Sequence, residues 1–177
     1  MGETVGVCDK MKEIMIGQEK VYEKLKELGI EFDYLEHPAA PTIEIARQYW
    51  KNLDSTHCKN LFFRNHKGNR HYLVIFHCDQ SLAIHDLEQL LKQGKLSFAS
   101  EQRMEKYLGL KPGSVSPFGL VNDTDHQVYV FLDENLKQVQ KLSFHPNDNR
   151  ASLAIRVEDF IRYMEASGNG YEWIKLY

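Results

Sequence analysis

The sequence has few cysteines, few glycines and prolines, and no long apolar stretch. Its three cysteines, Cys8, Cys58 and Cys78, are an odd and widely spaced set. This excludes a disulfide-rich secreted scaffold and indicates a reducing compartment. Eleven glycines and five prolines are too few for a collagen-like or low-complexity chain. The longest apolar run, residues 72–76, has the length of a strand, so no membrane span is expected.

The first residues also lack targeting signals. They contain neither the basic region nor the apolar stretch of a signal peptide. Gly6 stands where a myristoylation site needs Ser or Thr. We therefore expect a cytoplasmic protein without a membrane partner. The sequence pattern sets no oligomeric state.

Length and composition indicate one globular domain. The chain has 177 residues, of which 42% are hydrophobic and 27% charged, an ordinary balance for a single domain. A chain of this length can bury a core without help from disulfides or metals. Residues 1–15 have weak periodicity and are expected to form a loose N-terminal arm. Residues 16–177 are expected to form the single domain.

Hydrophobic periodicity and turn residues predict a mixture of helices and strands. A turn at residues 66–69 (His-Lys-Gly-Asn) makes the two runs around it a hairpin. The order contains no clean βαβ repeat, which favours an α+β domain with a mixed sheet. The helices are predicted over residues 17–28, a short stretch capped by Thr42, 85–93 (stopped by Gly94), 100–108 (stopped by Gly109) and 158–166. The strands are predicted over residues 30–37, 58–64, 70–77, 128–132, 142–144, 153–157 and 173–177.

The charge distribution is uneven. The net charge is −3, yet residues 51–70 carry a local +4 and residues 92–111 a local +3, so the remainder carries −10. Such asymmetry suits a protein that meets phosphate on one face. The alternative is that the basic clusters are ordinary solvated surface.

Lys59 is the first candidate site residue. It alternates along its predicted strand with Leu61 and Phe63, so it shares a strand face with apolar groups. A lysine in this position lies either at the wet end of the strand or in a pocket. Pocket lysines bind anions or polarise carbonyl groups.

Two further segments contain candidate residues. His145 ends a predicted strand and is followed by Pro146 and then by Asn149, so it either belongs to a structural turn or presents polar groups to a small ligand. Residues 111–119 contain two prolines and two glycines, which specify one rigid loop. That loop is either a tight connection or a surface whose backbone N–H groups face an anion or a carbonyl oxygen.

The motifs of several enzyme classes are missing. The chain has no Gly-x-Ser-x-Gly elbow, Walker loop, His-Glu-x-x-His or Gly-x-Gly-x-x-Gly. A hairpin centred near Gly68 places Cys58 opposite His77 and His57 opposite Cys78. Each face then has two soft ligands, whereas zinc needs three or four. We therefore expect neither a metal nor another cofactor, while a cysteine nucleophile paired with a histidine stays open without a supporting signature.

An ordered set of segments resembles one family. The set is specific, although each piece alone is weak. The segments are residues 36–42 (Glu-His-Pro-Ala-x-Pro-Thr), 59–64, 67–68, 72–74, 96–100 (Leu-Ser-Phe-Ala-Ser), 108–120 and 144–149 (Phe-His-Pro-Asn-x-Asn). In this order they resemble the YbaK/prolyl-tRNA-synthetase editing domains, in particular the free-standing members.

The resemblance implies a fold, an activity and roles for particular residues. The fold is a mixed sheet curved into a barrel-like core with helices around it, and the activity is hydrolysis of alanine mischarged onto proline tRNA. Lys59, His145 and Gly113 carry the catalytic roles, with Lys59 holding the phosphate backbone near the terminal adenosine. The implied substrate-binding residues are Asn60, Thr42, Asn149 and the loop residues Ser114, Val115, Ser116 and Pro117.

The expected partner is the acceptor end of proline tRNA, with prolyl-tRNA synthetase as a further candidate partner. Arg103 and Lys106 lie three residues apart on one predicted helix and are the preferred contacts with the acceptor stem. The alternative is an ordinary solvated helix face.

The chemistry fits these residues. An aminoacyl ester is activated, so its hydrolysis needs positioning and oxyanion stabilisation more than a strong base. In the family's mechanism the ribose hydroxyl of the substrate helps to activate water. A second pocket that admits alanine and excludes proline supplies discrimination that a synthetase lacks. Two alternatives stay open: removal of another amino acid such as cysteine or serine, and a binding protein that recognises tRNA or an amino acid without turnover.

Overall fold

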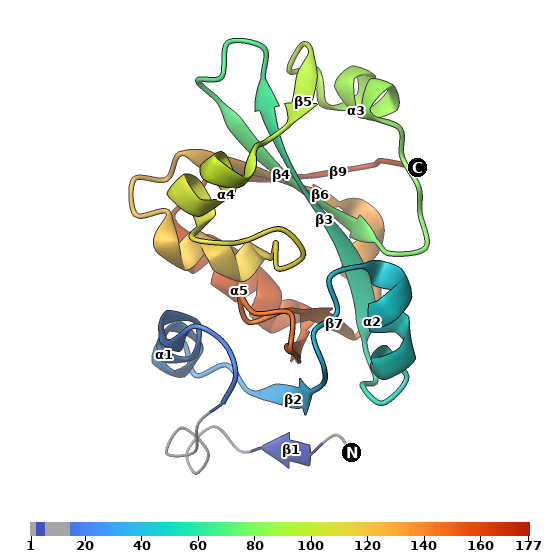
Figure 1. Cartoon of the computed structure of the whole chain (residues 1–177), viewed down its shortest axis with the longest axis vertical. Coiled ribbons are helices and arrows are strands. Elements are labelled where there is room, and N and C mark those ends of the chain that lie inside the picture. Colours follow the sequence, from blue (N-terminus) through green and yellow to red (C-terminus); the bar gives the residue numbers. More distant parts are fainter. Residues whose placement is uncertain (1–2, 6–14) are drawn as a thin grey trace.

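The computed structural model describes residues 3–5 and 15–177 (Figure 1). The predicted N-terminal arm, residues 1–15, therefore lies mostly outside the described residues. Within it, Glu3–Val5 forms a strand, β1, that pairs with the next strand of the chain. No helix among the described residues has the length and apolarity needed to cross a bilayer.

The described elements alternate irregularly between helix and strand. The α-helices are α1 (Glu19–Glu27), α2 (Ile43–Trp50), α3 (Ile84–Leu91), α4 (Glu101–Leu108) and α5 (Val157–Ser167), and the 3-10 helices are η1 (Pro117–Asn122) and η2 (Glu134–Gln138). The remaining strands are β2 (Phe32–Glu36), β3 (Thr56–Asn65), β4 (His71–His77), β5 (Leu96–Phe98), β6 (Val128–Asp133), β7 (Lys141–Phe144), β8 (Ala151–Arg156) and β9 (Tyr171–Ile174).

Local sequence signals account for several helix boundaries. The Thr42 hydroxyl accepts a hydrogen bond from the backbone N–H of Ile45 at 3.3 Å, and Ser100 caps α4 in the same way. Gly109 ends α4 with a positive φ of 63°. These helix starts and stops confirm the predicted ones, because each cap satisfies backbone groups that a helix end leaves unpaired.

Other boundaries differ from the prediction. Helix α3 ends at Lys92, which adopts the left-handed conformation two residues before the predicted stop at Gly94. The short strand β5 was not predicted, and the last three residues of the predicted loop 111–119 form the start of η1. The last strand, β9, ends at Ile174 rather than at residue 177.

The strands form one mixed sheet of nine strands. Its order is β1-β2-β8-β7-β3-β4-β6-β9, with β5 added beside β3. The β3–β7, β4–β6 and β6–β9 pairs are parallel and the others antiparallel. The hairpin register pairs Cys58 with His77, as its turn position predicts.

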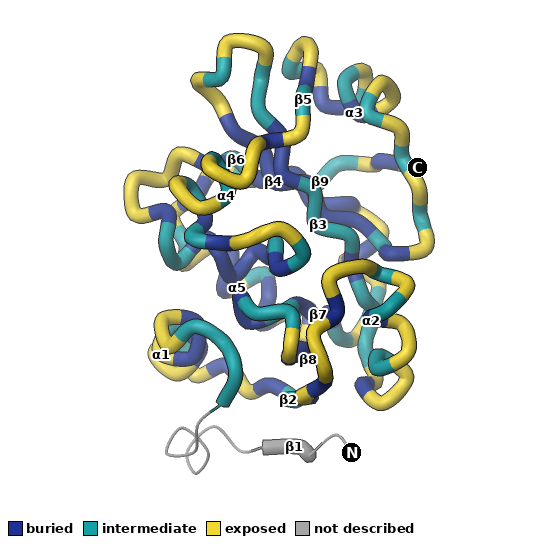
Figure 2. The backbone as a smooth tube through the Cα atoms, viewed as in Figure 1, coloured by how far each residue is buried: buried dark blue, intermediate teal, exposed yellow. Residues whose placement is uncertain are grey.

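The sheet curves around one main core. Phe144 on β7 and Leu153 on β8 pack in the same cluster as Phe62 on β3 and Val130 on β6, so both halves of the sheet face one interior. Helices α1 and α5 close this interior, and Figure 2 shows that buried residues concentrate along the central strands. These features confirm the predicted single α+β domain with a curved mixed sheet and surrounding helices.

A second cluster covers the other face of the central strands. Phe63 on β3 and Phe76 on β4 pack there against Leu87 and Leu91 of α3. Every residue from His71 to Phe76 is therefore buried. An uninterrupted apolar run is typical of a strand that is covered on both faces.

Strand β3 has an open edge that creates the site. It pairs with β7 only at Thr56 and His57, and with β5 only from Phe63 onward. The residues between these pairings have β4 on one side, and no strand among the described residues pairs with them on the other. The backbone oxygen of Phe62 points to this open side, where it accepts from Ala99 N at 2.9 Å. Because backbone direction alternates along a strand, the N–H and C=O groups of Asn60 point to the same side.

Candidate active site

A cavity of about 490 Å³ lies at the open edge of β3. Most of the rest of its wall comes from α2 with the segment before it, the segment after β4, the loop before η1, and the β7–β8 pair. Phe76 of β4, Phe98 of β5 and Met104 of α4 complete it. None of the described residues that line it carries a carboxylate. The cavity therefore combines apolar walls with neutral polar groups and one cation, Lys59.

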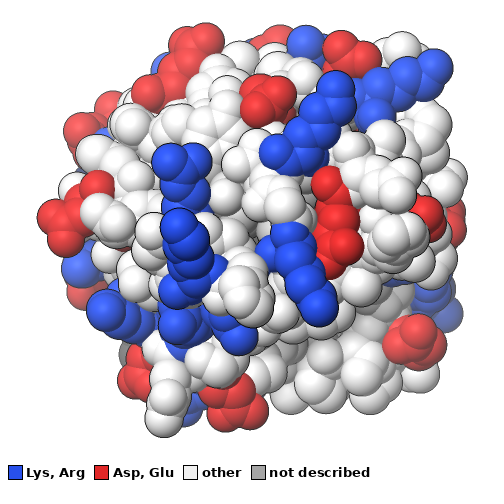
Figure 3. Space-filling model, turned by 90° about the horizontal axis from the view of Figure 1, so that it is seen from above, with Lys and Arg blue, Asp and Glu red and all other residues white. Residues whose placement is uncertain are grey.

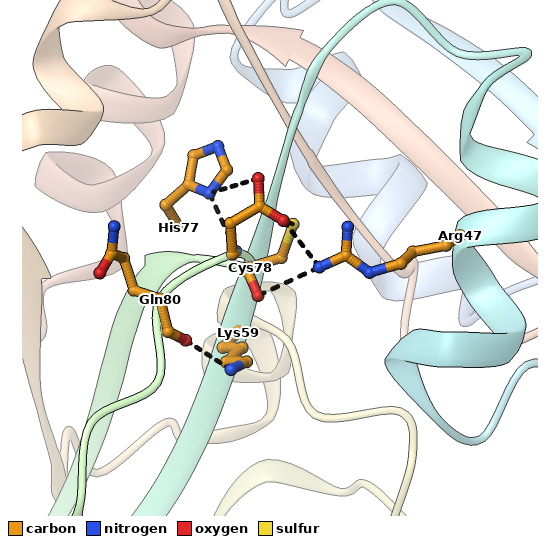
Figure 4. Close-up of polar contacts among 6 residues, drawn as sticks. Arg47, Lys59, His77, Cys78 and Gln80 are labelled. Carbon is orange, nitrogen blue, oxygen red and sulfur yellow. Dashed lines mark hydrogen bonds and ion pairs between the residues drawn. The ribbon is translucent and has the colours of Figure 1, made fainter.

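Lys59 points into this cavity. Its ammonium group donates a hydrogen bond to the backbone carbonyl of Gln80 (Figure 4). The ammonium nitrogen lies 6.0 Å from the centre of the Phe76 ring. Of the two positions that the strand pattern left open for this lysine, the structure adopts the pocket. An ammonium group has three donors, so two remain for an anion.

The segment that holds Lys59 is itself anchored to α2. Arg47 donates to the Asp79 carboxylate at 2.7 Å and to the backbone oxygen of Cys78 at 3.5 Å (Figure 4). The hydrogen bond from Arg47 lowers the pKa of Asp79. This pair connects α2 to the segment after β4 and so fixes the carbonyl that Lys59 contacts.

His145 lies on the opposite wall of the cavity, at the end of β7. Its Nδ1 faces the backbone oxygen of Ala151 at 2.7 Å. Burial lowers the pKa of His145, with a smaller effect from His37, whose ring centre is 5.9 Å away. The ring is therefore neutral at pH 7. Its Nδ1 carries the proton, because a carbonyl oxygen can only accept.

Two serine–histidine pairs adjoin His145. Ser143 contacts His57 Nδ1 through its hydroxyl, and Ser152 lies 3.0 Å from His37 Nε2. Both serines are buried and line the cavity. Burial lowers the pKa of His57 to about 4, and its ring stacks on Trp50 with centres 4.2 Å apart. These groups were missed as site residues by the sequence analysis.

Gly113 brings the loop before η1 against the cavity. Its φ is 84°, a conformation that favours glycine. A Cβ at this position would lie 3.1 Å from Pro41 Cα and 3.3 Å from Asn149 Nδ2. The close approach of three backbone segments therefore depends on the missing side chain.

The other residues of this loop are divided between the cavity and the core. Val115 lines the cavity, whereas Ser114, Ser116 and Pro117 are buried and are not part of its wall. The Ser116 hydroxyl accepts from Phe118 N at 3.1 Å and caps η1. The Pro117 carbonyl accepts from the Tyr163 hydroxyl at 2.8 Å. These contacts fix the loop on its side away from the cavity.

Asn60 and Thr42 also line the cavity. The side-chain Nδ2 of Asn60 donates to Cys58 O at 3.4 Å, while its buried Oδ1 has no partner among the described residues. Thr42 is the N-cap of α2. Asn149 is not part of the cavity wall, but its side chain lies beside Gly113.

Arg103 and Lys106 lie on α4, outside the cavity wall. Arg103 donates to Gly68 O and to His71 Nε2, both at 2.9 Å, and so connects α4 to the β3–β4 turn. Lys106 is exposed and lies 5.2 Å from the centre of the Tyr107 ring. The two residues border a smaller hollow that Gly68 and Ser100 share.

Basic side chains gather on one face. Figure 3 shows several Lys and Arg side chains across the middle of the face seen from above, with a few acidic side chains among them and others toward its edge. The elements at that end of the molecule are the β3–β4 turn, β5 and the end of α3 (Figure 1). Their exposed basic residues are Lys67, Arg70, Lys92 and Lys95.

One group among the described residues could hold a metal ion by its spacing: His77, Cys78 and Asp79, whose ligand atoms lie within 4.8 Å of one another. Two of these are already engaged. Asp79 pairs with Arg47, and His77 Nδ1 accepts from the backbone N–H of Asp79 at 3.0 Å. A metal would have to displace both contacts, and it would add charge beside the guanidinium of Arg47.

The structure thus brings together half of the predicted site residues. Lys59, Asn60, Thr42, Gly113, Val115 and His145 line one cavity. A cation, neutral hydrogen-bonding groups and unpaired strand backbone around one space can bind an anion and orient a carbonyl group. None of the described residues of its wall offers a carboxylate as a general base.

Comparison with known proteins identifies the sequence pattern. The aminoacyl-tRNA editing domain matches residues 37–163. The prolyl-tRNA editing protein ProX of Acetoanaerobium sticklandii is 40% identical over 163 residues, which cover 92% of this chain and 99% of that protein. Prolyl-tRNA synthetase associated domain-containing protein 1 of Mus musculus is 32% identical over 151 residues, which cover 83% of this chain and 89% of that protein.

Solved structures have the same fold. The crystal structure of hypothetical protein APE2540 matches with a TM-score of 0.68 at 21% identity, covering 88% of this chain and 99% of that one. A crystal structure described as that of a candidate trans-editing enzyme for prolyl tRNA synthetase matches with a TM-score of 0.65 at 19% identity. It covers 92% of this chain and 99% of that one.

Proposed function

The chain belongs to the aminoacyl-tRNA editing domain family, and on that basis we propose that it acts in trans to hydrolyse alanine from mischarged proline tRNA. The observation that carries the proposal is the cavity itself, with Lys59 on one wall, His145 on another and no carboxylate among its described lining residues. The 40% identity to a prolyl-tRNA editing protein supports proline tRNA as the substrate.

Lys59 holds a phosphate near the terminal adenosine. Its ammonium retains the hydrogen bond to the Gln80 carbonyl and donates its other two protons to phosphate oxygens. Phe98 lies at the edge of the same cavity, is 60% exposed, and packs against Phe63 in a tilted arrangement with ring centres 4.7 Å apart. A fixed, exposed aromatic ring beside a cation suits the terminal base of a single-stranded end.

The ester lies at the open edge of β3. The unpaired backbone N–H of Asn60 polarises the ester carbonyl, and the neutral His145 helps to position the ester. Water adds to the carbonyl carbon, the bond to the ribose oxygen breaks, and that oxygen takes up a proton. The neighbouring ribose hydroxyl activates the water, because the described residues of the cavity wall include no carboxylate that could do so.

Selectivity comes from the stiffness of the wall. Gly113 and Val115 face the cavity, while Ser114, Ser116 and Pro117 hold the loop from behind. A loop held in this way does not move aside for the ring of proline, whereas alanine fits. Asn149 supports this wall through its contact with the Gly113 backbone region.

The basic face guides the acceptor stem toward the cavity. Lys106 is exposed and contacts phosphate directly, while Arg103 fixes α4 against the β3–β4 turn and lies beside it. Phosphate contacts of this kind orient a nucleic acid without reading its sequence. Recruitment by prolyl-tRNA synthetase would bring the substrate to this face before the ester hydrolyses in solution.

The test is a deacylation panel on proline tRNA charged with alanine, proline, cysteine or serine. Rapid loss of alanine with proline retained supports the proposal. Preferential loss of cysteine or serine would keep the reaction and overturn the assignment of alanine. Binding of tRNA at low salt without hydrolysis of any ester would contradict the deacylase and leave a binding protein.

A further inference from the structure

Three polar side chains on the β7–β8 wall of the cavity donate their protons to other protein groups. They therefore present only hydrogen-bond acceptors to the cavity. We propose that Ser143, Ser152 and His145 bind the α-ammonium group of the aminoacyl ester. This inference rests on the proposed function, and it adds the part of the substrate that this wall recognises.

The three side chains lie on one face of the paired strands. Ser143 pairs with Ala154 and Phe144 with Leu153, so the same register places His145 opposite Ser152. Ser143 and His145 are two residues apart on β7 and therefore point to the same face. All three line the cavity.

The Ser152 hydroxyl has no proton to offer a ligand. His37 Nδ1 faces the carbonyl oxygen of Pro38 at 2.9 Å and must carry the ring proton. His37 Nε2 is then an acceptor, and it takes its hydrogen bond from the Ser152 hydroxyl at 3.0 Å. A serine oxygen that donates its proton keeps two lone pairs for a donor in the cavity.

Ser143 is arranged in the same way. The backbone of Trp50 and Leu53 raises the pKa of His57, which is the effect of acceptors that face a ring N–H, so we place the ring proton on the nitrogen away from Ser143. The remaining nitrogen, Nδ1, accepts from the Ser143 hydroxyl. The ring stays neutral at pH 7 because burial lowers its pKa to about 4. Ser143 therefore also presents lone pairs.

His145 supplies the third acceptor. Its Nδ1 proton is bound by Ala151 O, which leaves the lone pair of Nε2. Three acceptors without a donor match an ammonium group, which has three N–H donors and no acceptor. A hydroxyl or an amide group of the same size has fewer N–H or O–H donors and would leave at least one of the three acceptors without a partner.

The arrangement also fixes the direction of the substrate. Lys59 and Phe98 bind the nucleotide end of the substrate. The substrate ammonium lies away from Lys59, because two cations repel each other. The ammonium end therefore turns to the β7–β8 wall. The ester between them then spans the open edge of β3, where the backbone N–H of Asn60 lies.

The test compares two probes that cannot be hydrolysed: 3′-alanylamino-3′-deoxyadenosine and its 3′-lactylamino counterpart, which replaces the ammonium by a hydroxyl. Their affinities for the full chain are measured by titration followed by NMR. We expect the alanyl probe to bind roughly 10-fold to 100-fold more tightly, the effect of one charge-assisted hydrogen bond. Ser143→Ala and Ser152→Ala should each reduce this ratio, and Ser152→Thr should retain it.

Ser167→Ala is the matched control. The Ser167 hydroxyl contacts the backbone of Met164 and Asn169 and is not part of the cavity wall. It should leave the ratio unchanged. Equal binding of both probes by the wild type would overturn the proposal. So would variants that weaken both probes equally, because that is the result of a purely structural role.

Failure of the proposed function has a different signature. Absence of alanine hydrolysis from proline tRNA, together with a preserved probe ratio, would remove the deacylase and keep the ammonium site. Hydrolysis of alanine with equal binding of the two probes would keep the deacylase and remove the ammonium site. Binding is measured apart from turnover, so each result decides one of the two claims.

Discussion

Lys59 and Gln80 are joined by a hydrogen bond from the lysine ammonium to a backbone carbonyl inside the cavity. The carbonyl belongs to the segment that Arg47 anchors to α2. This contact holds a long and flexible side chain in one direction before a ligand arrives. A cation placed in advance needs less ordering when it meets a phosphate.

Gly113→Ala should destabilise the protein and impair deacylation. Its φ of 84° strains any Cβ by about 1–2 kcal/mol, and the Cβ would also crowd Pro41 and Asn149. Gly94→Ala is the matched control, because its φ is 77° and nothing lies within 4 Å of an added Cβ.

Urea unfolding and deacylation of Ala-tRNA(Pro) measure the two effects separately. Both variants should lose stability through backbone strain. Only Gly113→Ala should also lose activity. An active Gly113→Ala protein would contradict the role of this loop in shaping the cavity.

Lys106→Ala should weaken tRNA binding without affecting stability. Loss of one phosphate contact should lower the slope of log affinity against log salt by about one. Lys137→Ala is the control, since Lys137 also lies over an aromatic ring, that of Trp173 at 4.9 Å, but on η2. An unchanged salt slope in Lys106→Ala would show that Lys106 contacts no phosphate and belongs to an ordinary solvated helix face.

Arg103→Ala should behave differently from Lys106→Ala. Removing Arg103 leaves Gly68 O and the buried His71 Nε2 without their partner. An unsatisfied buried group costs about 1–3 kcal/mol. We therefore expect a lower urea midpoint together with weaker tRNA binding. A variant with unchanged stability would show that this contact does not hold α4 against the hairpin.

Stability should fall as the pH is lowered from about 6.5 toward 4. Burial lowers the pKa of His57 and of His71 to about 4, whereas histidine in an unfolded chain titrates near 6.5. In this window the unfolded state binds more protons than the native state, so acid favours unfolding. The loss by pH 5 is up to about 2 kcal/mol for each histidine.

Urea midpoints measured from pH 8 to pH 5 check this prediction. His71→Gln should flatten the pH dependence, whatever its effect at pH 8. The same substitution of His66, an exposed residue of the β3–β4 turn, should leave the dependence unchanged. A wild type with constant stability over this range would contradict the neutral, buried state of these rings.

Local signals explain which parts of the fold could be predicted. The turn at residues 66–69 sets the hairpin register, so the pairing of Cys58 with His77 follows from the sequence alone. Ser100 and Gly109 mark the ends of α4 in the same way. Strand β5 has only three residues, too few to show a period of two.

The site depends on contacts that no local pattern contains. The Ser143–His57 and Ser152–His37 pairs join residues 86 and 115 positions apart, and they exist because β7 lies beside β3 and β8 beside β2. For the same reason, the sequence left two positions open for Lys59, the wet end of the strand and a pocket. A pocket beside Lys59 exists because β3 is left open between its pairings with β7 and β5.

The most direct test of the central claim is the kcat/KM for deacylation of Ala-tRNA(Pro) by the wild type and by Lys59→Ala. Lys51→Ala, which removes an exposed lysine after α2, is the control. Loss of one charge-assisted phosphate contact predicts a decrease of about 10-fold to 100-fold in Lys59→Ala and none in Lys51→Ala. Equal activity of all three proteins would contradict the assignment of the cavity at Lys59 as the site of hydrolysis.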